Sequence, residues 1–279
     1  MKRKRNNRYS RILVILSLIF FYVPIVYVCF FSFNSSRSLT HFTGLSLQWY
    51  EAMFSNRTIM EALWVTIYVA IIATLVSTIV GTLTAIGLSR SRKIVREVVE
   101  QINNLPMMMP EIVIAISLML FFIGLNIKLG MATLIISHIV FCIPYVLISV
   151  MPKLRQLDPN LPEAAMDLGA TPFQALYKVI IPQIIPGIVS GALIAFTMSF
   201  DDFVISFFNT GEGINNISIY VYTMYKRINP SINALSALIV LFVSMVLIGM
   251  HVVPKIMDRR QHKTKQKGNE DEEMECLLP

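Results

Sequence analysis

Residues 161–182 read LPEAAMDLGATPFQALYKVIIP, and this stretch has the pattern of two short helices joined by a tight turn. Pro162 fits the first turn of a helix, and Glu163 places a negative charge near the positive N-terminal end. The Ala, Met and Leu residues that follow favour helix. Gly169 can end that helix with a positive φ, and Pro172 can begin a second one. The stretch therefore predicts helix, glycine turn and helix.

The composition around this stretch is that of a membrane protein. Hydrophobic residues make up 55% of the 279 residues and charged residues 15%, with a mean hydropathy of +0.63. A soluble domain of this length needs more polar surface, and short alternating segments typical of a β-barrel do not dominate. The predicted fold class is therefore all-α, a polytopic membrane protein with six transmembrane helices. The predicted spans are residues 12–33, 63–88, 105–124, 130–151, 183–207 and 232–256.

The basic residues set the predicted orientation. The N-terminal tail, the 89–104 and 152–182 loops and the C-terminal tail together hold 19 of the 24 Lys and Arg residues. The positive-inside rule places these segments, and hence both termini, in the cytoplasm. The net charge of +7 is accordingly assigned to topology and to contact with anionic membrane lipid, and no nucleic-acid partner is expected.

Three parts follow along the chain. Residues 1–11 are a cytoplasmic basic tail, and residues 12–257 are the six-helix transmembrane domain, which includes the cytoplasmic loop 152–182. Residues 258–279 are a polar tail that is predicted to be disordered.

The sequence offers no pattern for catalysis or for a metal site. The three cysteines and four histidines are scattered without metal-ligand spacing. No phosphate-binding loop of the form GxxxxGK[ST] occurs, and no Ser/His/Asp or Cys/His arrangement stands out. The chain is therefore predicted not to be an enzyme and to carry no cofactor.

Two local patterns concern the outer side. The segment 34–62 carries apolar and aromatic residues at near-helical spacing, which predicts a short interfacial helix. Thr58 and Glu61 have the spacing of a capping box that would begin the second span.

Gly187, Gly191 and Ala195 form a small-residue stripe, so the fifth span is expected to pack closely against another helix.

The third and fifth spans each contain an irregularity. The third opens with PMMMPE at residues 106–111, and two prolines four residues apart distort a helix. A kinked entry and a role in lining a pathway both remain open, and the ionisable Glu111 favours the pathway. The fifth span can also end near Phe200, with the rest forming a partly buried outer segment.

The 161–182 stretch resembles the cytoplasmic signature of ABC-importer permeases. That signature is Glu-Ala-Ala, three residues, Gly, nine residues, Ile, one residue and Leu-Pro. Val179 and Ile181 stand where the signature has Ile and Leu. The resemblance implies the type I importer permease fold and a coupling helix that docks into a groove of the ATPase subunit. The implied coupling residues are Glu163, Ala164, Ala165, Gly169, Pro172 and Pro182.

The resemblance extends to the PotC-type permeases of bacterial spermidine/putrescine importers. It is carried by residues 32–37, 110–113, 163–169 and 199–204. It implies location in the bacterial inner membrane, a second permease subunit (PotB-type), two ATPase subunits that bind ATP-Mg (PotA-type) and an extracytoplasmic polyamine-binding protein (PotD-type). The alternatives are the same machine with another small organic cation, an amino-acid derivative or ferric iron, and an ion-coupled secondary transporter.

Two adjacent acids are the best candidates for contact with a polycation. Asp201 and Asp202 interrupt an apolar run, and they either end the fifth span among lipid headgroups or form an anionic outer gate. Carboxylates and aromatic faces suit ammonium groups, which adds Tyr222. Lys226 can pair with a carboxylate when no substrate is present, and Glu111 is expected deeper in the pathway.

Overall fold

The computed structural model describes residues 7–38, 40–224 and 230–245. The chain divides into two compact units. The terminal unit consists of Met1–Ser55 with Arg227–Pro279, and the core unit is Asn56–Lys226.

The terminal unit contains α1 (Asn7–Phe31), α2 (Gln48–Ser55) and a helix over Pro230–Met245. The apolar part of α1, Arg11–Phe31, confirms the first predicted span. The α2 helix confirms the predicted short helix of the outer segment. Pro230–Met245 covers the first part of the predicted sixth span. The remainder of that span, Lys226 and the 258–279 tail lie outside the described residues.

A buried asparagine organises the loop between α1 and α2. The Asn34 side chain accepts a hydrogen bond from Thr43 N (2.9 Å) and donates to the Ser38 and His41 carbonyls (2.9 and 2.8 Å). The Trp49 indole N–H donates to the Asn34 carbonyl at 2.7 Å, which ties α2 to the same loop. These bonds satisfy backbone groups that no helix or strand would pair.

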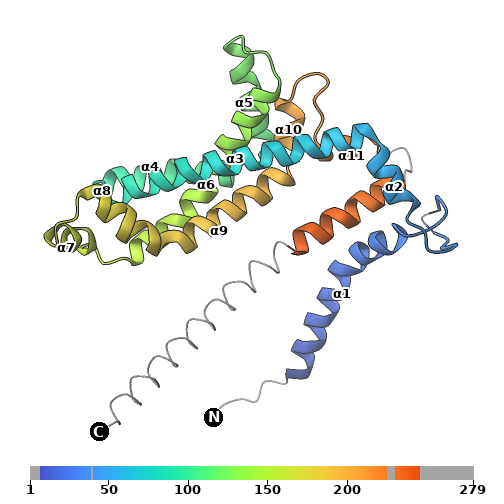
Figure 1. Cartoon of the computed structure of the whole chain (residues 1–279), viewed down its shortest axis with the longest axis horizontal. Coiled ribbons are helices and arrows are strands. Elements are labelled where there is room, and N and C mark those ends of the chain that lie inside the picture. Colours follow the sequence, from blue (N-terminus) through green and yellow to red (C-terminus); the bar gives the residue numbers. More distant parts are fainter. Residues whose placement is uncertain (1–6, 39, 225–229, 246–279) are drawn as a thin grey trace, which may run out of the picture. The chain divides into compact units, whose positions relative to one another are not determined.

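Three long helices form the centre of the core unit and lie side by side (Figure 1). They are α3 (Arg57–Ser89), α6 (Met131–Gln156) and α9 (Ile181–Phe200). A Cβ on Gly81 would lie 2.8 Å from the Val146 side chain, and one on Gly191 would lie 3.1 Å from Val146 Cα. Glycine is therefore what allows α3 and α9 to approach α6 so closely. Gly187, Gly191 and Ala195 are all buried, which confirms the predicted packing stripe.

The start of α3 differs from the prediction. Asn56, and not Thr58, caps the helix, because its side chain accepts from Thr58 N (3.0 Å) and Ile59 N (3.3 Å). Glu61 then lies too far along the helix to close a capping box, and it pairs with Arg57 one turn before it at 2.6 Å. The predicted capping box was wrong.

The distortion predicted at the two prolines of the third span is confirmed, and it is a complete break. The structure has α4 (Lys93–Met108), then α5 (Glu111–Gly124), with a bend of 105° between them. Pro110 has no N–H to continue α4, and Met109 before it is extended (ψ 146°), as a residue before proline prefers. Much of the predicted 89–104 loop is therefore helix.

The fifth span begins earlier than predicted. Its apolar helical segment runs from Pro172 to Phe200 and includes α8 (Pro172–Ala175) and the π-helical turn η1 (Leu176–Ile180). It ends at Phe200, as the alternative reading of the fifth span expected. Before it lies α7 (Leu161–Asp167), and after it come α10 (Val204–Asn209) and α11 (Ile217–Met224). Within the described ranges, four helices are long and apolar enough to cross a membrane, or five if α4 and α5 form one broken span.

Candidate functional site

The turn after α7 has the predicted glycine geometry. Gly169 has φ +87°, a conformation that side chains with a Cβ disfavour. Its N–H donates to the Met166 carbonyl (2.9 Å), and Ala170 N–H donates to the Ala165 carbonyl (3.1 Å). These bonds close the end of α7 and reverse the chain. The predicted helix, glycine turn and helix are confirmed.

The second helix of this loop has a complete cap. Thr171 Oγ1 accepts from Gln174 N at 3.3 Å, and Gln174 Oε1 accepts from Thr171 N at 2.9 Å. Pro172 occupies the first turn of α8, and Pro182 the first turn of α9. Two reciprocal bonds thus fix the direction in which the chain leaves the turn.

The loop presents large apolar side chains to its surroundings. Leu168 is 91% exposed, Phe173 74% and Tyr177 63%. The Phe173 and Tyr177 rings are parallel, with centroids 6.5 Å apart. No residue of α7 is buried. We call Leu168, Phe173 and Tyr177 the loop surface; exposed apolar side chains gathered on one short segment are typical of an interaction site.

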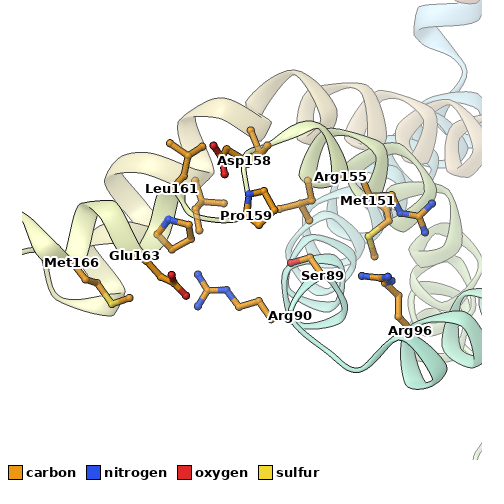
Figure 2. Close-up of a pocket in the computed structure, with 14 residues that line it drawn as sticks. Ser89, Arg90, Arg96, Met151, Arg155, Asp158, Pro159, Leu161, Glu163 and Met166 are labelled. Carbon is orange, nitrogen blue, oxygen red and sulfur yellow. The ribbon is translucent and has the colours of Figure 1, made fainter.

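A cavity of about 560 Å³ lies behind α7, between it and the ends of α3, α4 and α6 (Figure 2). The Arg90 guanidinium and the Glu163 carboxylate point toward one another there (Figure 2). Arg155 lines the same cavity, and its Nη2 donates to both carboxylate oxygens of Glu100, each at 2.5 Å. From α7, the charged Glu163 lines this cavity together with Leu161, Pro162 and Met166.

The second candidate region is the break between α9 and α10, where the two adjacent acids differ in surroundings. Asp201 is exposed, whereas Asp202 is 4% exposed. Asp202 Oδ1 accepts from Ile205 N (3.0 Å), and Oδ2 accepts from Ser206 N and Ser206 Oγ (both 2.7 Å). The Asp202 carboxylate therefore caps α10. Among the described residues, the Asp201 carboxylate caps no helix.

A histidine on α6 joins this break from the other side. His138 is 1% exposed, and its Nδ1 lies 2.8 Å from Ser199 Oγ and its Nε2 2.9 Å from Ser206 Oγ. The same Nε2 is 3.4 Å from Asp202 Oδ2. Asn216 Nδ2 donates to Ser206 Oγ at 2.7 Å. In the sequence, His138 is one of four scattered histidines, and the signal that marks it is a polar residue in the middle of an apolar span.

Two further predicted residues lie at the same break. Glu111 begins α5, which packs beside α10, and it lies within electrostatic range of Asp202 and Asp201. It is thus closer to the acid pair than predicted. The Tyr222 ring centroid is 4.8 Å from that of Phe203. We call Glu111, Asp201 and Asp202, with Phe203 and Tyr222, the acidic break.

Long apolar helices, an exposed helical turn and an acidic break at the end of a span are features expected of a membrane transport component. Residues 77–263 match the family described as "Binding-protein-dependent transport system inner membrane component", and the chain belongs to this family. It is therefore a membrane permease component of a transport system, as predicted, and such a component is not itself an enzyme.

Curated relatives cover most of the chain. The spermidine/putrescine transport system permease protein PotC of Escherichia coli (strain K12) is 36% identical over 251 residues, which is 90% of this chain and 92% of the relative. The PotC protein of Haemophilus influenzae is 36% identical over 85% of this chain and 93% of its own length. The putrescine permease PotI of Escherichia coli is 35% identical over 82% of this chain and 84% of its own length.

Solved structures support the fold class. A bacterial ABC transporter involved in the import of the acidic polysaccharide alginate has a chain that aligns with a TM-score of 0.67 at 19% identity, over 91% of this chain and 98% of that one. The same kind of transporter in complex with a pentasaccharide-bound periplasmic protein gives a TM-score of 0.62. The predicted all-α permease fold of ABC importers is confirmed.

Proposed function

We propose that this chain is one permease subunit of an ATP-driven importer of polyamines such as spermidine and putrescine. Its relatives are named for these substrates. The acidic break is the observation that carries the proposal, because it places three carboxylates and two aromatic rings around the end of the fifth span.

The chemistry of the break suits a ligand with several ammonium groups. Asp201 is exposed and offers a carboxylate for a charge-assisted hydrogen bond. Glu111 supplies a second carboxylate from α5, and Tyr222 supplies an aromatic face for a cation. Asp202 contributes by shaping the break, since both of its oxygens accept hydrogen bonds from α10. Lys226 is proposed as the resting counter-ion.

The loop surface is proposed as the contact with an ATPase subunit. Leu168, Phe173 and Tyr177, which follow α7 around a rigid turn, expose apolar side chains, and this fits a coupling segment that inserts into a groove of a partner. ATP-Mg would be bound and hydrolysed on that partner (PotA-type, two copies), with no cofactor on this chain. A second permease subunit (PotB-type) and an extracytoplasmic polyamine-binding protein (PotD-type) complete the proposed complex. The proposed location is the bacterial inner membrane with both termini cytoplasmic.

The remaining candidates differ in measurable ways. An importer of another organic cation, an amino-acid derivative or ferric iron would use the same ATPase and would not be saturated by polyamines. An ion-coupled secondary transporter would respond to an ion gradient and ignore ATP.

The test is uptake in proteoliposomes that hold the full complex, with ATP enclosed and the polyamine-loaded binding protein outside. We expect ATP-dependent spermidine or putrescine uptake that Asp201→Asn lowers by about tenfold or more, the scale of one charged hydrogen bond. Glu212→Gln, which changes an exposed acid in the α10–α11 connection, should leave uptake unchanged. Uptake that follows an ion gradient without ATP, or that polyamines fail to compete for, would overturn the proposal.

A further inference from the structure

One side chain spans the break between α9 and α10. His138 contacts Ser199 in the last turn of α9 with one ring nitrogen and Ser206 in the first turn of α10 with the other, at 2.8 and 2.9 Å. Asp201 and Asp202 lie between these two serines in the sequence. We propose that His138 is the positioning residue that holds the acidic break in its substrate-binding geometry, an inference that rests on the proposed function.

The hydrogen-bond directions assign the tautomer of the ring. The Ser206 hydroxyl has one proton, and the Asp202 carboxylate accepts it at 2.7 Å. Asn216 Nδ2 also donates to Ser206 Oγ, and Asn216 Oδ1 accepts from Ile219 N, which fixes the orientation of that amide. The remaining contact of Ser206 must therefore come from a proton on His138 Nε2. In the neutral ring Nδ1 then accepts from Ser199, and every polar atom of the clamp is satisfied.

The clamp matters because the break has no glycine or regular helix to hold it. Asp202 is buried, and a buried carboxylate is tolerated only while it is hydrogen-bonded. Without His138, the start of α10 keeps its hydrogen bonds from Asn216, but the side-chain link between Ser199 at the end of α9 and Ser206 is lost. We expect Asp201, which lies between these two serines, to lose its fixed position. His138 also lies on α6, the helix that ends at Gln156 shortly before α7 begins. One helix thus connects the acidic break with the loop surface.

Three substitutions separate the two arms of the clamp. Gln can place an amide N–H near the position of Nε2 and keep the bond to Ser206, whereas Asn reaches only Ser199 and Ala reaches neither. Uptake rates are normalised to the amount of assembled complex. We expect His138→Ala and His138→Asn to raise the KM of polyamine uptake about tenfold, and we expect the KM of His138→Gln to lie within about threefold of the parent value. Ser137→Ala is the matched control, because the Ser137 hydroxyl is buried beside His138 and makes no hydrogen bond.

A second measurement reports the geometry without substrate. Asp201→Cys is introduced into a chain whose native cysteines are replaced by Ala, and its rate of reaction with a charged methanethiosulfonate is measured in the assembled complex. We expect His138→Ala to change this rate severalfold and His138→Gln to leave it close to the starting value.

The outcomes distinguish the two proposals. Unchanged KM and unchanged labelling in His138→Ala would overturn the positioning role, even if less complex is recovered, because that is a loss of stability alone. A parent complex that imports no polyamine, together with a labelling rate that depends on His138, would overturn the proposed function and support the clamp.

Discussion

The turn after α7 and the break after α9 both interrupt helices, and they do so by opposite means. The turn relies on a glycine with φ +87° and leaves Leu168 91% exposed. The break contains no glycine and is held by buried side chains, among them Asp202 and His138. The first arrangement suits contact with a partner, and the second suits a fixed arrangement of charges inside a membrane protein.

The largest expected effect is at Asp202. Asp202→Ala removes the cap of α10 and leaves Ile205 N, Ser206 N and the Ser206 hydroxyl without their acceptor. Losing a buried hydrogen-bonded carboxylate destabilises by about 3 kcal/mol or more. We expect little folded subunit in membranes, measured by immunoblot and by thermal unfolding of the purified complex. Asp201→Ala, at the exposed neighbour, should accumulate normally; equal loss in both variants would contradict the division of roles between the acids.

The next effect is at the α7 turn. A β-branched residue at a left-handed backbone position costs about 1–2 kcal/mol, so Gly169→Val should displace α7 while the transmembrane helices still insert. Glu163→Lys reverses the charge in the first turn of α7 and should act in the same direction. We expect uptake to fall at least tenfold, with the ATPase lost from the purified complex or active without transport.

Gly169→Asn is the control for this effect, because asparagine tolerates positive φ and no neighbouring atom lies within 4 Å of the added Cβ. It should retain most uptake. Normal ATP-driven uptake in both Gly169→Val and Glu163→Lys would exclude α7 as the coupling element.

The same contrast explains what the sequence could predict. The α7 turn was predictable, because Gly169, Thr171 and Pro172 act locally, through backbone conformation and caps. The clamp was not predictable, because His138 and Ser206 are 68 residues apart and meet only through tertiary packing. The prediction that Glu111 lies deeper in the pathway failed for a similar reason. The 105° bend after α4 places α5, which begins at Glu111, beside α10.

A smaller effect is expected on the loop surface. Leu168→Ser and Phe173→Ser remove apolar side chains that are 91% and 74% exposed, so the stability of the subunit should not change. If these side chains enter a groove of the ATPase, the double variant should weaken that association by at least about tenfold, the scale of losing two buried apolar contacts. Titration of purified ATPase onto the detergent-solubilised subunit measures this affinity. An unchanged affinity would show that the partner contacts another surface.

The smallest effect is expected from single cysteines that report on which side of the membrane each connection lies. These substitutions should not reduce uptake. Arg92→Cys and Gln156→Cys lie at exposed ends of α4 and α6 and should react with an impermeant maleimide only from the cytoplasmic side. Leu45→Cys and Glu212→Cys are exposed in the opposite connections and should react only from outside. Leu168→Cys adds the contrast, because it should react from the cytoplasmic side in the isolated subunit and be protected once the ATPase binds. External labelling of Gln156→Cys would place the loop surface on the wrong side of the membrane for any ATPase.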